Sequence, residues 1–506
     1  MCNIVHGKLW TQIRNKFGDN IVIPLIVYFD EYETNNVLGS HTGVDKIGAT
    51  YFMLPTLPPQ FQSALKHIFL TLLFRDTDRK TFGNKATFKP LLEELHDLER
   101  NGLLINNVTV YFSCILVTGD NLGIHQICGF VTSFSANRIC RLCKIEKKQY
   151  QSQTMEDPNL LRQSRDYEED LKSDVFETGL TEYCVWNDLP SFHVIENVFF
   201  DSMHDFWEGV CVYDLSALLL HYIQIKRFTL QNINDRIMAF NYGPADKGNA
   251  VPCLKKEKLM QKKLNFSASE TLTFVKYLGI IIGDCIPVND EYWNLYLYLR
   301  NIGDIINLRY FNKDCITLLK TLITEHHELY IQLFGETLKP KHHFLLHYPR
   351  TIELIGPLRN VWCMRPEAKH KPSKVTAHVS NSRVNLPYTL AIKNQLQQCY
   401  SFMCKDSLID RIEYGNAEVI TDETLRDINH ILPENFYVNS TVHSVPWITI
   451  ENVTYKPSMV ITTGYKDHVP LFAEIVNILV NVEKVSFFNK KNIYLWLVIA
   501  CLCIPS

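Results

Sequence analysis

The sequence has little excess charge of either sign, no long apolar run and no regular arrangement of cysteines. Its 51 lysines and arginines nearly balance 54 aspartates and glutamates, so the formal net charge is −3 at pH 7. No overall basic field marks a nucleic-acid partner, and any such partner must be bound by local patches. The apolar run at residues 493–504 is too short to span a bilayer. We expect it to be a strand or a tail, and we expect no membrane partner.

The cysteines exclude a secreted protein held together by disulfides. Fifteen are present, an odd number without regular spacing, and no apolar segment follows Met1. This indicates a reducing intracellular compartment in which most of them are free thiols. With 46% hydrophobic and 12% aromatic residues, the 506-residue chain is expected to bury a large core and to form more than one domain.

Three apolar runs precede an amphipathic segment in the first quarter of the chain. Residues 21–29, 47–54 and 67–74 are rich in β-branched and aromatic side chains, which favours strands, although the third run is short enough to be a helix. Residues 88–102 have a proline near the start, leucines on one helical face and a glycine at the end, which predicts a helix. The apolar run 108–120 predicts a further strand, so the expected order is strand, strand, strand, helix, strand.

Carboxylates follow two of these strands. The first leads into Asp30, Glu31 and Glu33, and the fourth ends at Asp120. In a ribonuclease-H-like fold the first strand is central and the fourth lies beside it, so acids at their ends lie close together and can hold Mg²⁺. On this interpretation all three acids after the first strand belong to a metal site. The alternative is ordinary turn chemistry, in which aspartate precedes glycine or asparagine.

A second group of candidate ligands contains cysteine and histidine. Cys140 and Cys143 form the only C-x-x-C spacing in the chain, which is weak evidence alone because fifteen cysteines produce such a spacing by chance. His342 and His347, in the segment 339–349, can complete a zinc site that closes a loop of about two hundred residues. The alternative is an ordinary helix face or a basic surface that faces DNA.

Six motifs occur in order between residues 10 and 403. They are YFDEYETNNVLGSH, GATYF with LPP, LLFRDTDRKTFGN, TGDNLG with its C-x-x-C, DSMHDFWEGV and MRPEAKHK. Together they resemble the transposase of CACTA (En/Spm-like) DNA transposons of animal genomes. The resemblance implies an Asp-Asp-Glu recombinase with an α/β, ribonuclease-H-like core that uses Mg²⁺ or Mn²⁺ to cut and join DNA. It also implies a nuclear protein that binds transposon terminal inverted repeats and target DNA as a homodimer or higher oligomer.

The resemblance assigns roles to particular residues. The catalytic, metal-binding carboxylates fall at Asp30, Asp120 and Glu367. By similarity to the related recombinase of the vertebrate immune system, the zinc ligands fall at Cys140, Cys143, His342 and His347. A D-x-x-H signature near the active site falls at Asp201 and His204, where Asp201 can equally be an ordinary helix cap.

The family also implies a catalytic core divided by helices. We expect residues 1–200 to form the first part of the core with the C-x-x-C half-site, 201–340 a mainly α-helical insertion, 341–431 the rest of the core, and 432–506 a β-rich extension. DNA contacts are expected beside Glu367, at Lys369, His370, Lys371 and Lys374. The lysine-rich segment 254–264 is a further candidate, or simply a solvated face.

Two features depart from the family. Pro366 stands where an aromatic residue usually precedes the glutamate; a helix can still begin there, but the packing residue is lost. The chain begins close to the first catalytic strand, so an N-terminal DNA-binding region is expected to be missing. Two other classes therefore stay open. One is a domesticated or inactive DNA-binding or scaffold protein, and the other is a nuclease or hydrolase of the same fold that acts without transposition.

Overall fold

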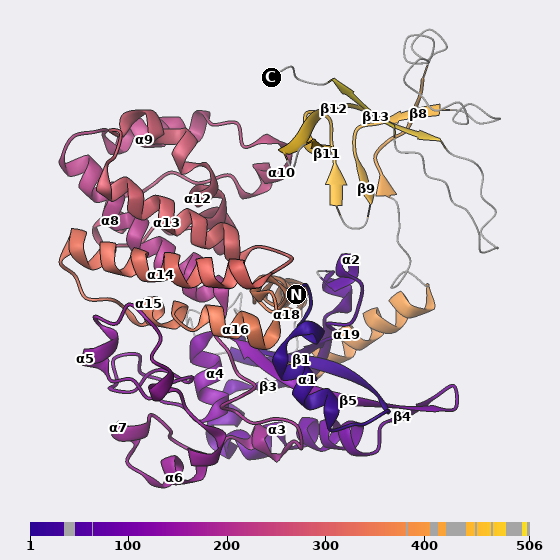
Figure 1. Cartoon of the computed structure of the whole chain (residues 1–506). Helices are drawn as coiled ribbons and strands as arrows, with labels where there is room; N and C mark the ends of the chain where they lie inside the picture. The colour runs from indigo at the N-terminus through magenta and orange to yellow at the C-terminus, as the bar shows by residue number, and fades with distance from the viewer. Residues whose placement is uncertain are drawn as a thin grey trace. The chain divides into compact units, whose positions relative to one another are not determined.

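The structure is a computed structural model in which two compact units are distinguished (Figure 1). It describes residues 1–34, 46–62, 64–380, 383–404, 413–420, 442–450, 453–466, 469–481 and 498–502. The larger unit comprises residues 1–239 and 251–407, and the smaller one comprises 240–250 and 408–506. Most of the apolar run 493–504 lies outside the described residues.

A five-stranded mixed sheet forms the centre of the larger unit. Its strands are β1 (Ile21–Glu33), β2 (Lys46–Met53), β3 (Phe69–Arg75), β4 (Leu103–Ile105) and β5 (Val108–Gly119), in the spatial order β3-β2-β1-β5-β4. β1 is antiparallel to β2 and parallel to β5, and the pairs β2–β3 and β4–β5 are antiparallel. The mixed α/β class expected from the sequence is confirmed, and the third apolar run forms a strand.

Helix α3 (Asp76–Arg100) covers one face of this sheet. Its buried face includes Phe88, Leu91 and Leu95, which pack with apolar residues of β1 and β5. The predicted start at residue 88 is wrong, because the helix begins twelve residues earlier with a kink at Gly83, where φ is 78°. The early turns are held by Arg79, whose ion pairs with Glu31 and Asp76 are both 2.9 Å long.

Helices dominate the larger unit after β5. They include α4 (Asn121–Cys128), the π-helix η6 (Met203–Val210), α8 (Cys211–Gln224), α9 (Leu230–Ala239), α11 (Lys256–Met260), α12 (Ala268–Ile282), α13 (Glu291–Ile306), α14 (Lys313–Phe334), α15 (Pro340–Leu345), α16 (Tyr348–Ile355), α17 (Met364–Ala368), α18 (His370–Val379) and α19 (Leu386–Met403). Helices α13 and α14 lie side by side (Figure 1). Among the described residues, no helix is long and apolar enough to cross a membrane.

The smaller unit is built mainly from strands. They are β6 (Glu413–Tyr414), β7 (Glu418–Val419), β8 (Val442–Val445), β9 (Ile448–Ile450), β10 (Val453–Tyr455), β11 (Val460–Lys466), β12 (Val469–Asn481) and β13 (Val498–Leu502). They form one sheet of order β10-β9-β6 and another of order β11-β12-β8-β7, in which β13 also pairs with β12. Its small core contains Val445, Ile448, Ile475 and Ile478. The first strand begins before the predicted boundary at residue 432.

Candidate functional site

Asp30 lies in β1, and Asp120 directly follows the neighbouring parallel strand β5 at the same level of the sheet. Phe29 of β1 is paired in register with Gly119 of β5, and the residue that follows each of them is an aspartate. Asp120 is also the N-cap of α4, where its Oδ1 atom accepts a hydrogen bond from the amide of Gly123 at 2.5 Å. The pKa of Asp120 is raised, mainly by burial and to a smaller extent by the negative charge of Asp30. Two acids that repel each other in a half-buried position fit a site for a cation.

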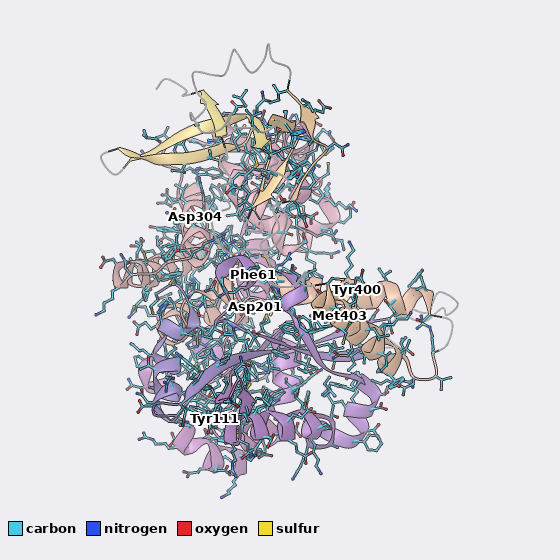
Figure 2. The ribbon with its side chains drawn as sticks, turned by 90° about the vertical axis from the view of Figure 1, so that its right-hand side faces the viewer. Phe61, Tyr111, Asp201, Asp304, Tyr400 and Met403 are labelled. Carbon is cyan, nitrogen blue, oxygen red and sulfur yellow. The ribbon has the colours of Figure 1, made fainter. Side chains whose placement is uncertain are left out.

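Glu367 reaches this region on α17 and contacts the predicted D-x-x-H signature. His204 Nε2 lies 2.8 Å from Glu367 Oε1, and His204 Nδ1 lies 2.7 Å from Asp201 Oδ2. Asp201 is 3% exposed and lies in the interior of the larger unit (Figure 2). Its Oδ2 atom also accepts from the His204 amide at 3.0 Å, so the same carboxylate caps this turn and contacts the His204 ring.

The surroundings of His204 favour its charged form. Burial opposes the charge, but hydrogen bonds to Asp201, Cys363 and Glu367 raise the pKa of His204 well above its ordinary value. The negative charge of Glu367 and the positive charge of His204 both act on Asp120. Asp30, Asp120 and Glu367, called the acidic site below, therefore share one electrostatic environment.

Glu31 does not belong to the acidic site, and this part of the prediction is wrong. Successive residues of a strand point to opposite faces, so Glu31 points away from the side of Asp30. There it forms its ion pair with Arg79, whose side chain is only 8% exposed. Glu33, at the end of β1, is exposed. Only Asp30, of the three acids that follow the first apolar run, contributes to the site.

Four buried side chains form a second possible metal site, called the Cys/His cluster below. Its members are Cys140, Cys143, His343 and His347. Three contacts of 3.3 Å join Cys140 Sγ to His347 Nε2, Cys143 Sγ to His343 Nε2, and the two imidazole Nε2 atoms to each other. Ligand bonds of about 2.0–2.3 Å to tetrahedral zinc place neighbouring ligand atoms about 3.3–3.8 Å apart. The cluster can therefore hold a metal such as zinc.

The predicted zinc ligand His342 is wrong, and its neighbour His343 takes that place. His343 and His347 are four residues apart, so they lie on one side of the helical segment, whereas His342 lies on another. His342 Nε2 instead lies 3.1 Å from Asp214 Oδ1 in a buried pair. The helical spacing of His343 and His347 was a signal in the sequence that could have identified the right ligand.

The Cys/His cluster has a supporting carboxylate that the sequence did not reveal. Glu156 Oε1 lies 2.6 Å from His347 Nδ1, which leaves Nε2 of this ring directed at the cysteines. Burial opposes the charged imidazole, but Cys140 and Glu156 raise the pKa of His347 to about 9. Burial also opposes the thiolate, yet the hydrogen bond from Cys143 and the charge of His347 lower the pKa of Cys140 well below its ordinary value. A thiolate is the form of cysteine that binds metal.

The four predicted DNA-binding residues differ in their surroundings. His370 is 3% exposed, and its Nε2 atom lies 3.2 Å from Asp30 Oδ2, so it faces the acidic site and not an outer surface. Lys369 donates a hydrogen bond to the backbone oxygen of Leu65 at 2.8 Å. Lys371 and Lys374 are exposed and available to a phosphate. The predicted DNA contact of His370 therefore stays a prediction, and it could be made only by a phosphate that enters the acidic site.

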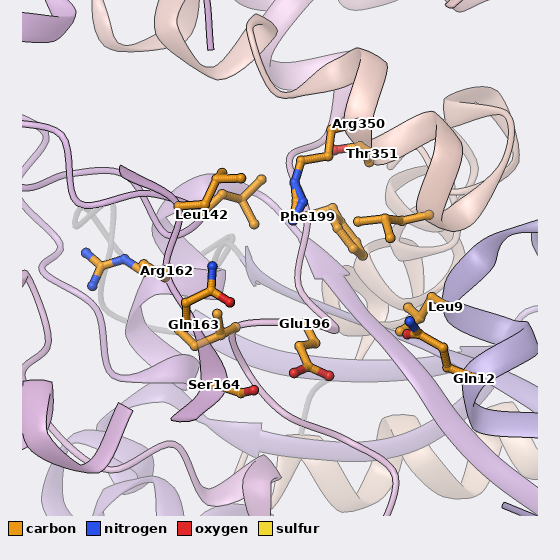
Figure 3. A pocket seen from close by; sticks show the side chains of 13 residues that line it. Leu9, Gln12, Leu142, Arg162, Gln163, Ser164, Glu196, Phe199, Arg350 and Thr351 are labelled. Carbon is orange, nitrogen blue, oxygen red and sulfur yellow. The ribbon is translucent and has the colours of Figure 1, made fainter. Parts of the chain in front are cut away.

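The described part of the larger unit contains several cavities, of which two are large enough to compare. One of about 260 Å³ borders the acidic site and is lined by Asp120, His204, Tyr213, Lys341 and Phe344, among others. The other, of about 420 Å³, is lined by residues such as Gln163, Phe199 and Arg350 (Figure 3). Although the second cavity is larger, its lining includes no member of the acidic site. The smaller cavity reaches Asp120 and could admit part of a substrate to the acidic site.

The sequence matches no protein-family model and no curated protein. Relatives therefore supply no function for comparison. The geometry of the acidic site and of the Cys/His cluster is the basis for the function proposed next.

Proposed function

We propose that the larger unit is a metal-dependent DNA recombinase with a ribonuclease-H-like core, similar to CACTA transposases. The reaction is cleavage and transfer of phosphodiester bonds at transposon ends in the nucleus. The observation that carries the proposal is the sheet order β3-β2-β1-β5-β4, in which Asp30 and Asp120 follow the paired residues Phe29 and Gly119. Glu367 is joined to the same environment through His204.

The donor set of the acidic site fits Mg²⁺ or Mn²⁺. Carboxylate oxygens are the ligands these ions prefer, and a cation would relieve the repulsion that raises the pKa of Asp120. Ions held by Asp30, Asp120 and Glu367 would activate water or a 3′-hydroxyl and stabilise the leaving oxygen. His204 holds one oxygen of Glu367 and so fixes the direction of this carboxylate.

The Cys/His cluster is proposed to be a structural zinc site. All four of its residues are buried, and a closed set of four protein ligands leaves no position open for substrate. Cys143 and His343 are separated by 200 residues, so a metal would close a very long loop. Such a clip would hold the segment after Asp120 against the segment before Glu367.

Exposed lysines beside the acidic site are proposed to bind the DNA backbone. Lys371 and Lys374 lie on α18, which follows the helix of Glu367. The 260 Å³ cavity adds the cation of Lys341 and the rings of Tyr213 and Phe344 next to Asp120. Cationic and aromatic side chains together are typical of surfaces that bind single-stranded DNA ends.

The test is DNA cleavage and joining by the purified chain in the presence of Mn²⁺ or Mg²⁺. Glu367→Gln keeps the shape of the side chain but removes an anionic ligand, so it should abolish both reactions without changing folding or zinc content. Glu93→Gln is the matched control, because the side chain of Glu93 is 67% exposed on α3. Unchanged cleavage by Glu367→Gln would overturn the assignment.

A second candidate function is DNA binding without catalysis by a protein derived from a transposase. The contacts of His204 with Glu367 and of His370 with Asp30 favour it, since histidine nitrogens lie against two of the three carboxylates. Binding of Mn²⁺ that disappears in Asp120→Ala would favour the recombinase. Cleavage of RNA–DNA hybrids without joining would instead indicate a nuclease of the same fold.

A further inference from the structure

A buried arginine lies between the two cysteines of the Cys/His cluster. Arg141 is 0% exposed. Its Nη1 atom donates to Asn121 Oδ1 at 2.8 Å, and its Nη2 atom donates to the backbone oxygen of Phe199 at 2.7 Å. The guanidinium carbon also lies 3.9 Å from the centre of the Phe200 ring. One side chain therefore links its own segment to two others, at Asn121 and at residues 199–200.

These contacts lead to the acidic site. Asn121 directly follows Asp120 and begins α4. Asn121 Nδ2 donates to Asp205 Oδ1 at 2.5 Å, and Asp205 directly follows His204, the residue that contacts Glu367. One hydrogen bond of Arg141 thus ends on Asn121, the neighbour of Asp120, and Asn121 in turn bonds Asp205, the neighbour of His204.

The same guanidinium is packed against residues that support the cluster histidines. The Phe200 ring stacks on Phe344, with ring centres 4.0 Å apart and planes inclined by 13°, and Phe344 follows His343 in the chain. The Phe200 ring also lies 6.0 Å from the ring of His347. Arg141 is therefore tied to the Cys/His cluster through both its backbone and this aromatic layer.

We propose that Arg141 is a positioning residue that couples metal occupancy of the Cys/His cluster to the geometry of the acidic site. The proposal rests on the proposed function for the role of that acidic site. The planar guanidinium holds two acceptors in fixed directions, and a fully buried charge has no water molecules to replace either partner. A displacement of the cysteine backbone must then move Asn121, and with it Asp120. Because coupling is reciprocal, Mn²⁺ at the acidic site also tightens zinc binding by the same factor.

The experiment measures Mn²⁺ binding by electron paramagnetic resonance in the full chain, with zinc loaded and with zinc removed. Removal of zinc should lower the Mn²⁺ affinity at least about fivefold, the lower end of measured couplings between sites. Arg141→Lys should lower it similarly while zinc content stays at one per chain, because lysine cannot hold both acceptors. A second readout is hydrogen exchange of the Gly123 amide, which donates to Asp120 Oδ1. Exchange of the Gly123 amide should become faster both when zinc is removed and in Arg141→Lys.

Arg162→Lys is the matched control. Arg162 is also buried, at 4% exposure, and donates to the backbone oxygen of Cys140 at 3.1 Å. It also donates to the backbone oxygen of Thr178 at 2.5 Å, and its guanidinium carbon lies 5.7 Å from the centre of the Phe130 ring, so these contacts include neither Asn121 nor Asp205. Zinc-loaded Arg162→Lys should therefore bind Mn²⁺ and protect the Gly123 amide as the unmodified chain does. General damage from replacing a buried arginine would affect both variants.

Asn121→Ala provides a second route if Arg141→Lys does not fold. It breaks the link to Asp205 while leaving the arginine in place, and it should reproduce the loss of Mn²⁺ affinity. Normal Mn²⁺ binding and normal Gly123 protection in zinc-loaded Asn121→Ala would overturn the coupling, as would an equal loss in Arg162→Lys.

If the unmodified chain shows no Mn²⁺ binding that depends on Asp120, the proposed function fails. Exchange at Gly123 with and without zinc then still decides whether the two sites are coupled.

Discussion

The Nε2 atom of His204 lies 2.8 Å from the Oε1 atom of Glu367. The other nitrogen of this ring is held by Asp201, whose side chain is 1% exposed. A buried carboxylate thus orients a charged imidazole, and the imidazole orients a carboxylate of the acidic site. One Glu367 oxygen is fixed by this contact, which leaves the second oxygen for a cation.

Replacing His204 by alanine should reduce both stability and Mn²⁺ binding. Loss of the partner leaves Asp201 as an unpaired buried charge, which costs about 3–5 kcal/mol in the free energy of unfolding. Denaturant unfolding checks this value. The double variant Asp201→Asn/His204→Ala should regain most of the stability but not the Mn²⁺ affinity, because Glu367 stays unoriented. Recovery of both would show that His204 acts on stability alone.

The stability contributed by His204 should depend on pH in a defined direction. Its pKa is raised in the folded chain, so the contribution is complete below the unfolded value of about 6.5 and is lost as the pH rises above it. The difference in unfolding free energy between the unmodified chain and His204→Gln should therefore shrink from pH 6.5 to 9. Urea unfolding at several pH values measures it. A difference that grows with pH would contradict the assigned charge state.

Asp120→Asn should stabilise the metal-free protein at pH 7. Burial and Asp30 raise the pKa of Asp120, so its charged form weakens the fold, and stability is lost as the pH rises from about 4 through the folded value. Asparagine keeps an oxygen that can accept from the Gly123 amide. Mn²⁺ at a hundred times its dissociation constant should add about 2.7 kcal/mol to the unmodified chain. It should add almost nothing to Asp120→Asn, and equal stabilisation of both would place the ion elsewhere.

His343→Ala and His342→Ala form a matched pair for the Cys/His cluster. Elemental analysis should find no zinc in His343→Ala, because only three ligands remain. His342→Ala should keep one zinc per chain but lose stability, since Asp214 loses a buried partner 3.1 Å away. Zinc lost from the second variant and kept in the first would restore the ligand originally predicted from the sequence.

Replacing Lys371 and Lys374 by alanine should weaken DNA binding without changing Mn²⁺ affinity. Each lost phosphate contact should lower the slope of log affinity against log salt concentration by about 1. Fluorescence anisotropy with labelled duplex ends at several salt concentrations measures this slope. Lys89→Ala, at a side chain that is 67% exposed on α3, is the control. An equal effect of Lys89→Ala would indicate binding that depends only on total charge.

Local sequence patterns determined much of the central sheet and part of each site. Continuous apolar runs predicted β1 and β5, because strands covered on both faces have no polar alternation. Acids placed directly after such runs indicated Asp30 and Asp120, and the C-x-x-C spacing indicated Cys140 and Cys143. These signals are readable because they depend on residues close together in the chain.

Tertiary structure decided the rest. The helical turn between α15 and His347 places His343, and not the adjacent His342, beside the two cysteines. Asp30 and Glu31 point to opposite faces of β1, so only Asp30 reaches the acidic site. The start of α3 depended on Arg79, whose ion pair with Glu31 joins that helix to β1. The roles of Arg141 and Glu156 also come from partners far away in sequence. A side chain's chemistry is set by the atoms packed around it, and those atoms are brought together only when the chain folds.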